Sequence, residues 1–169
     1  ELSLNRSQYI NKNQKVSDQL IADSGYGQGQ ILMNPLQLAS IYSAFVNNCS
    51  IYQPHIVQGK TRTWIKNVFS KETSQTIKED LINVIADEKG TGHAIYHDSI
   101  ALAGKTGTAE IKQSQSDTTG TELGWFTVMT TDSKQPLLIT TMVEDVKDRG
   151  GSGYVVEHTK TPLDLYLSK

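Results

Sequence analysis

The residue types with the clearest chemical potential gather in one ten-residue stretch, LAGKTGTAEI, at positions 102–111. It contains Gly104-Lys105-Thr106, which is how a phosphate-binding loop ends. A complete loop of that kind needs G-x-x-x-x-G-K-[ST], because its first glycine lets backbone N–H groups surround a phosphate. Ser99 stands where that glycine belongs, and the residues after Thr106 alternate as in a strand, whereas a phosphate loop continues into a helix. The sequence therefore argues against nucleotide binding.

Composition narrows the function classes further. The chain has 169 residues, 37% of them hydrophobic, which is enough for one globular unit with a moderate core. A net charge of −2 and the lack of a basic stripe with interleaved aromatic residues argue against a nucleic-acid partner. One cysteine and four scattered histidines offer neither a disulfide framework nor metal-ligand spacing. No apolar run is long enough to cross a bilayer. Because the chain starts at Glu1 without an initiator methionine, we expect it to be a piece of a longer protein.

The elements that must position this stretch begin with a helix after residue 34. Asn34 is a good N-cap, Pro35 occupies the first helical position, and Gln37 completes an Asn-x-x-Gln variant of the capping box. We expect the helix to end near Asn47 and Asn48, both of which tolerate a left-handed C-cap. One apolar face would hold Leu38, Ile41, Tyr42 and Phe45.

The rest of the pattern has an α+β order. Residues 1–22 are expected to form a poorly defined lead-in with a short amphipathic turn. Ser70 can cap a second helix, and Pro162 should kink the last one. The elements expected after the first helix are a short extended segment at 51–57, a strand or turn at 61–70, a helix at 71–87, strands at 103–112, 123–130 and 137–144, and a helix at 155–167. The last two strands would be joined by a turn marked by Asp132, Ser133 and Pro136.

Three segments together carry a family resemblance: GYGQGQILMNPLQLASIYSAFVNN at 25–48, AGKTGTAEI at 103–111 and GWF at 124–126. In this order they resemble the C-terminal part of the transpeptidase domain of class B penicillin-binding proteins. They are most similar to the low-affinity, methicillin-resistance-like enzymes of Gram-positive bacteria. The likeness runs from about Asp23 to the end of the chain. It implies a partial penicillin-recognising fold of the β-lactamase/transpeptidase type, an α+β fold with an antiparallel sheet and packed helices, with residues 1–169 as the C-terminal portion of the domain.

The family uses three motifs, S-x-x-K, S-x-N and K-[ST]-G, and this chain holds the third. No serine is followed three residues later by lysine, and the nearest approaches, at 63–66 and 131–134, begin with threonine. Ser3-Leu4-Asn5 fits S-x-N formally but lies too close to GYGQG, so we interpret it as chance. The resemblance thus predicts a fragment without its nucleophile, inactive by itself.

What the resemblance implies for the retained half is a role in binding the substrate. The parent enzyme would be a peptidoglycan D,D-transpeptidase that cross-links stem peptides ending in D-Ala-D-Ala through an acyl-serine, and that binds β-lactams. Lys105 would supply an ammonium and Thr106 a hydroxyl for the substrate, Gly107 would let the substrate backbone pass close, and the N–H of Thr108 would belong to the oxyanion hole. A lysine on a strand is usually a solvated edge charge, so this assignment depends on the accompanying GYGQG and GWF segments.

The same resemblance predicts supporting residues around the cleft. Tyr26 and Gln28 would border it, although both also fit a tight turn before the Asn34 cap. Glu110 would lie near the groove floor. Residues 150–153 would form a flexible loop at the end of the groove or a plain turn.

The remaining expectations concern partners and location. The resemblance implies no cofactor and no metal. Expected partners are stem peptides, β-lactams, the remainder of the same transpeptidase domain and, because we expect an uncovered apolar sheet face, other copies of the chain. The expected location is the outer face of the bacterial cytoplasmic membrane, with an N-terminal anchor outside this chain. The alternatives are a fragment of a β-lactam sensor or of a serine β-lactamase, and a non-catalytic interaction module.

Overall fold

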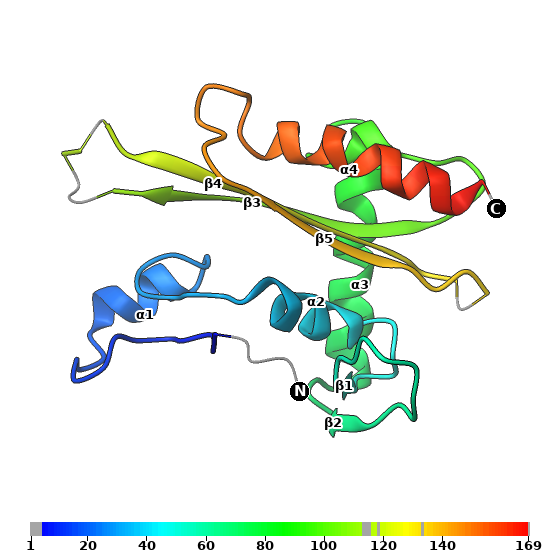
Figure 1. Ribbon diagram of the computed structural model, residues 1–169, viewed down its shortest axis with the longest axis horizontal. Coiled ribbons are helices and arrows are strands. Elements are labelled where there is room, and N and C mark those ends of the chain that lie inside the picture. Colours follow the sequence, from blue (N-terminus) through cyan, green and yellow to red (C-terminus); the bar gives the residue numbers. More distant parts are fainter. Residues whose placement is uncertain (1–4, 113–115, 118, 133, 169) are drawn as a thin grey trace.

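A three-stranded antiparallel sheet runs along the molecule and carries helices on both of its faces (Figure 1). The structure is a computed structural model and describes residues 5–112, 116–117, 119–132 and 134–168. The helices and strands are α1 (Asp18–Ser24), α2 (Pro35–Ser43), β1 (Ile51–Tyr52), β2 (Thr63–Ile65), α3 (Lys71–Ala86), the 3₁₀ helix η1 (His93–Ile95), β3 (Leu102–Ile111), β4 (Thr121–Thr130), β5 (Leu138–Val143) and α4 (Ser152–Leu167). The predicted α+β order is confirmed, and the ends of β3, β4 and β5 differ from the predicted ones by at most two residues.

The sheet has the order β3-β4-β5, so β3 is an edge strand. Its two faces contribute to two hydrophobic clusters. Phe126 and Val128 of β4 point to the face that α4 covers, and Met129 points to the opposite face, beside α2 (Figure 1). Both faces of the sheet are therefore covered at the second half of β4, and an uncovered apolar face elsewhere on the sheet stays a prediction. A strand covered on only one face alternates buried and exposed residues. The second half of β4 is instead buried on both faces.

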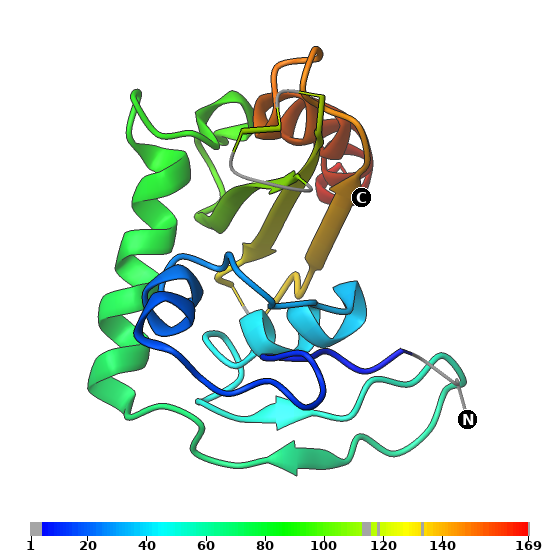
Figure 2. The ribbon, with the colours of Figure 1, turned by 90° about the vertical axis from the view of Figure 1, so that its left-hand side faces the viewer.

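Helix α3 stands beside β3 and joins the two clusters (Figure 2). Leu81 belongs to the cluster on the α2 side, and Ile85, one turn later, belongs to the cluster under α4. Ser70 caps the helix as predicted, since its hydroxyl accepts a hydrogen bond from the Thr73 N–H at 3.0 Å. At its other end the helix holds the loop that follows it, since the Gly92 N–H donates to the Val84 carbonyl at 3.0 Å.

Helix α2 begins as predicted but ends early. The Asn34 side chain accepts from the N–H groups of Leu36 at 2.9 Å and Gln37 at 3.4 Å. In a capping box the Gln37 side chain would accept a hydrogen bond from the Asn34 N–H. That part of the prediction is wrong, because the Asn34 N–H donates to the hydroxyl of Ser7 at 3.0 Å. The α-helix ends at Ser43, and the chain from there to Cys49 forms turns. Asn48 does adopt the predicted left-handed conformation, with φ of 51°.

Helix α4 starts earlier than its apolar pattern indicates. Gly150 and Gly151 have positive φ and form the turn, but Ser152 and Gly153, expected in the same loop, belong to the helix. The helix continues through Pro162 as one element. Proline removes only one backbone donor, and burial of Val155, Val156, Thr159 and Leu163 against the sheet offsets that loss.

The β1–β2 pair is a small separate hairpin at one end of the molecule (Figure 2). Its strands are shorter than the extended segments that the sequence predicts. Several of its large apolar side chains are exposed: Ile56, Val57, Trp64 and Ile65. The exposed apolar surface of this chain therefore gathers on the hairpin more than on the central sheet.

Candidate functional site

The free edge of β3 is the centre of the candidate site. Two side-chain donors contact outward-facing carbonyls of this strand: Lys105 Nζ, from the strand itself, lies 2.8 Å from the Thr106 oxygen, and Gln28 Nε2 lies 3.3 Å from the Thr108 oxygen. The N–H and C=O of one antiparallel strand residue point the same way. The N–H groups of Thr106 and Thr108 therefore face away from β4, toward an incoming ligand.

Lys105 and Thr106 point to opposite faces of the sheet. In register, Lys105 lies across from Thr127 and Thr106 from Phe126. Lys105 is exposed, and within the described part of the chain no carboxylate forms an ion pair with it. Its contact with the Thr106 carbonyl brings the ammonium back to the strand edge, where it can meet an anion.

The Thr106 side chain is buried, with 8% of its surface exposed, and its hydroxyl lies 2.8 Å from the hydroxyl of Thr91. Thr91 lies in the loop between α3 and η1, and the sequence analysis missed it. The Gly90-Thr91-Gly92 triplet was the only available signal, since nothing in the spacing predicts which hydroxyl of a distant loop meets a strand.

The two glycines of β3, Gly104 and Gly107, differ in the space around them. A Cβ added at Gly107 would meet Trp125 Cβ at 3.5 Å, an ordinary contact. At Gly104 an added Cβ would lie 2.9 Å from both Ile85 Cδ1 and the Thr127 oxygen. Gly104 is thus required by packing, whereas the fold alone gives no reason for glycine at 107.

A groove of about 460 Å³ lies beside the second half of β3. It brings together four of the predicted site residues and three that the sequence analysis did not single out. The predicted ones are Tyr26, Gln28, Thr108 and Glu110; the others are Asp23, Gly29 and Glu122. Lys105, Thr106 and Gly107 do not line this groove but precede it along the same strand edge.

Tyr26 and Gln28 come from a tight turn after α1. Gly27 and Gly29 adopt positive φ of 80° and 79°, which lets the chain reverse. The turn is tied to Asp23, whose carbonyl accepts from the Gln28 N–H at 3.0 Å and whose carboxylate accepts from the Tyr26 hydroxyl at 3.0 Å. The tight turn is therefore present and its residues line the groove, while their role at a substrate cleft stays a prediction.

The titration of Tyr26 follows from this contact. Its hydrogen bond to Asp23, together with the negative charge of that carboxylate, raises the pKa of the phenol above its ordinary value of 10.0. Tyr26 is therefore a neutral donor at physiological pH. Glu110, expected near the floor of the groove, lines it and forms an ion pair with Lys112 at 2.6 Å.

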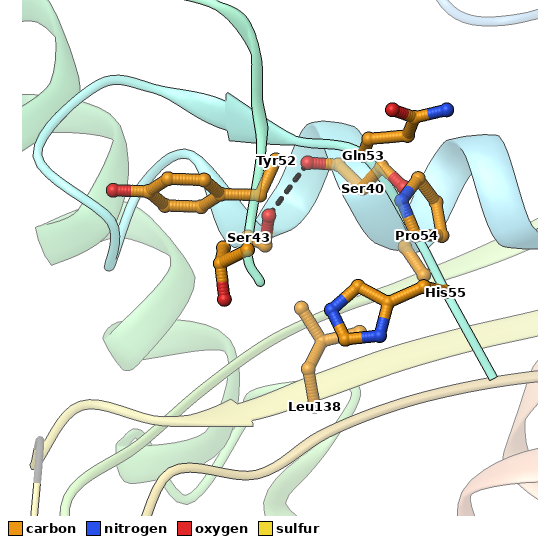
Figure 3. A pocket seen from close by; sticks show the side chains of 9 residues that line it. Ser40, Ser43, Tyr52, Gln53, Pro54, His55 and Leu138 are labelled. Atoms are coloured by element: carbon orange, nitrogen blue, oxygen red, sulfur yellow. Dashed lines mark hydrogen bonds between the residues drawn. The ribbon is translucent and has the colours of Figure 1, made fainter. Parts of the chain in front are cut away.

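A second hollow of about 260 Å³ lies between α2 and the β1–β2 hairpin (Figure 3). Ser40 and Ser43 line it together with His55, which raises the question of a serine–histidine pair. Both serine hydroxyls donate to helix carbonyls, Ser40 to Leu36 and Ser43 to Ser40, and the His55 Nδ1 contacts the Val57 oxygen instead. Neither serine is activated here.

The remaining predictions concern the other family motifs, metal binding and membrane spans. Ser3 and Leu4 of the formal S-x-N, and Ser133 of the turn and of the 131–134 segment, lie outside the described residues. Within the described ranges, no group of three or more His, Cys, Asp or Glu side chains is arranged to hold a metal ion. No helix of those ranges is long and apolar enough to cross a membrane.

Comparison with known proteins places these features in a family. A family model described as the penicillin binding protein transpeptidase domain matches residues 1–161. The chain is 45% identical over 147 residues to penicillin-binding protein 3 of Bacillus subtilis, covering 85% of this chain and 22% of that protein. It is 25% identical to the peptidoglycan D,D-transpeptidase MrdA of Haemophilus influenzae, over 86% of this chain and 25% of that protein.

The fold is similar to solved structures of the same kind. Penicillin-binding protein A from M. tuberculosis, in its ceftriaxone acyl-enzyme complex, superposes with a TM-score of 0.73 at 16% identity, covering 92% of this chain and 36% of that chain. The predicted partial penicillin-recognising fold is thus confirmed, and so is the family resemblance; the methicillin-resistance-like type stays a prediction. The chain belongs to the family of penicillin binding protein transpeptidase domains.

Proposed function

We propose that this chain is the C-terminal, substrate-recognising part of a peptidoglycan D,D-transpeptidase that also binds β-lactams. The observation that carries the proposal is the free edge of β3. There an exposed lysine at 105, which forms no ion pair with any described carboxylate, and an outward-facing N–H at Thr108 lie along one strand next to a groove. The chain spans 22% and 25% of the two relatives named above, so the activity belongs to a longer protein.

Recognition follows from the chemistry of the ligand. A stem peptide ending in D-Ala-D-Ala has a free carboxylate beside the amide that is cleaved, and a β-lactam has a carboxylate in a similar place. Lys105 attracts that anion, and the Thr106 hydroxyl donates a hydrogen bond to it. The rest of the peptide lies along β3 as an added strand and passes close to Gly107, where no side chain obstructs it.

The chemical step uses a serine outside this chain. Its oxygen attacks the carbonyl of the penultimate D-Ala, the Thr108 N–H stabilises the negative charge that develops on the carbonyl oxygen, and the terminal D-Ala leaves as the free amino acid. An amine of a second stem peptide then attacks the acyl-serine, forms the new amide and releases the serine. The lysine of an S-x-x-K motif, also outside this chain, carries the proton.

The groove beside Thr108 would receive the part of the donor peptide that precedes the scissile bond. Gln28 and Tyr26 offer amide and phenol groups to it, and Glu110 and Glu122 add negative charge. We further propose that the complete protein acts at the outer face of the cytoplasmic membrane through an N-terminal anchor outside this chain, and that it is of the low-affinity type.

The test uses the longer protein that contains this chain. It would be incubated with a donor peptide ending in D-Ala-D-Ala and with a D-amino acid as acceptor, and the released D-Ala and the new amide would be quantified by mass spectrometry. A transpeptidase produces both. Acylation by penicillin without transfer to the amine would identify a β-lactam sensor, and rapid hydrolysis of penicillin would identify a β-lactamase.

A further inference from the structure

Thr91 makes a contact that the chemistry above does not use. Its hydroxyl oxygen lies 2.8 Å from that of Thr106, although the two residues are 15 positions apart. Within the described part of the chain, this is the only hydrogen bond of either hydroxyl. Thr106 is buried and Thr91 is exposed. The hydrogen-bonding state of the Thr106 hydroxyl therefore depends on Thr91.

The loop that carries Thr91 is packed tightly against the end of α3. The Gly92 N–H donates to the Val84 carbonyl at 3.0 Å. A Cβ at Gly90 would collide with that same carbonyl, and one at Gly92 would come within 3.1 Å of Ile85. The two glycines let the backbone lie directly on the helix, so the position of Thr91 is set by α3 and does not depend on a long flexible loop.

The direction of this hydrogen bond decides what Thr106 can do. Each threonine hydroxyl has one proton and two acceptor lone pairs. If Thr106 donates to Thr91, it can only accept from a ligand and would repel a carboxylate. If Thr91 donates to Thr106, the Thr106 proton is free for the carboxylate, and the two hydrogen bonds strengthen each other.

We propose that Thr91 is a positioning residue that donates to Thr106 and thereby directs the Thr106 proton toward the carboxylate of the substrate or β-lactam. The proposal rests on the proposed function of the β3 edge. It adds a specificity role for the loop between α3 and η1, since ligands that lack the carboxylate gain nothing from Thr91.

The test compares variants of the complete transpeptidase domain. Thr91→Val keeps the shape of the side chain but removes its hydroxyl, and Thr91→Ser keeps the hydroxyl. Thr76→Val is the matched control, because Thr76 is an exposed threonine on α3 whose hydroxyl donates only to the Glu72 carbonyl. For each variant, the dissociation constant of the pre-acylation complex and the acylation rate constant would be measured separately, with a penicillin and with its methyl ester.

We expect Thr91→Val to raise the dissociation constant for the penicillin by roughly tenfold, the effect of losing support for one hydrogen bond to a charged group. Thr91→Ser and Thr76→Val should stay near wild type. The ester should bind all four proteins with the same affinity. Should Thr91→Val melt well below wild type, Thr91→Ala, which also lacks the hydroxyl, replaces it in the comparison.

Equal losses for the acid and the ester would overturn the proposal, since they would indicate a structural role only. Unchanged penicillin binding in Thr91→Val would overturn it as well. Failure of the proposed function looks different, because the wild-type domain would then form no acyl-enzyme, or would form one without transferring the acyl group to an amine acceptor.

Discussion

At the scale of single residues, the strand edge combines groups that the sheet itself does not need. Lys105 is exposed, the Thr108 N–H faces away from β4, and Gly107 leaves an open space. None of these features contributes to the two hydrophobic clusters. Their shared property is access from outside the sheet, which is what an extended ligand requires.

The role of Lys105 can be tested by removing its charge. Lys105→Ala in the complete domain should lower the second-order rate of acylation by penicillin by about 10²-fold, the order expected when a charged anchor for the ligand is lost. The melting temperature should stay unchanged, because exposed charges contribute little to stability. Lys89→Ala, at another exposed lysine, is the control. Acylation at the wild-type rate would refute the assignment of Lys105.

The two glycines of β3 give opposite predictions. Gly107→Ala should leave the melting temperature unchanged or slightly higher, since the new Cβ has room and alanine loses less backbone entropy on folding. It should nevertheless slow acylation by roughly tenfold or more by displacing the ligand from the strand. Gly104→Ala should instead lower stability by about 1–3 kcal/mol through overpacking against Ile85. Thermal melts and acylation kinetics on both variants would check the pair, and a reversed pattern would contradict it.

Sequence reasoning placed the local motif well but not its distant neighbours. Lys105, Thr106, Gly107 and Thr108 follow one another, so one strand positions all four. Thr91 was missed because its contact with Thr106 is made by folding α3 against β3. Asp23 and Glu122 were missed for the same reason, because they line the same groove only in the folded chain.

At the scale of elements, the N-cap of α2 offers a direct test. Asn34→Ala should destabilise the protein by about 1 kcal/mol, because the N–H groups of Leu36 and Gln37 lose their acceptor. Asn34→Ser keeps a capping oxygen and should recover most of that loss. Chemical denaturation of the three proteins would measure both differences. Equal stability of Asn34→Ala and wild type would show that the cap is energetically irrelevant.

Element types were predictable where local signals were strong, and element ends were not. The caps at Asn34 and Ser70 fixed two helix starts, and branched residues fixed three strands. The end of α2 and the start of α4 depend on what each segment packs against. Gly124 illustrates this, since any Cβ there would lie 2.5 Å from Val155 of α4, a packing requirement that no local pattern reveals.

At the scale of the whole molecule, we propose that the chain holds the recognition edge of a transpeptidase, and the described serines nearest that edge are not activated. Ser24, Ser40 and Ser43 lie nearest the recognised motifs, and each donates its hydroxyl to a backbone carbonyl. We therefore expect no covalent adduct when the isolated 169-residue chain meets excess benzylpenicillin. Intact-mass spectrometry would detect one, and a stoichiometric mass increase would mean that a nucleophile is present after all.

The central claim is that recognition lies in this chain and the nucleophile outside it. Peptide mapping of the longer protein after benzylpenicillin labelling tests that division most directly. We predict one acylated serine, in a peptide outside residues 1–169 and followed three positions later by lysine. An acylated serine within these 169 residues, or no acylation of the longer protein, would contradict the account.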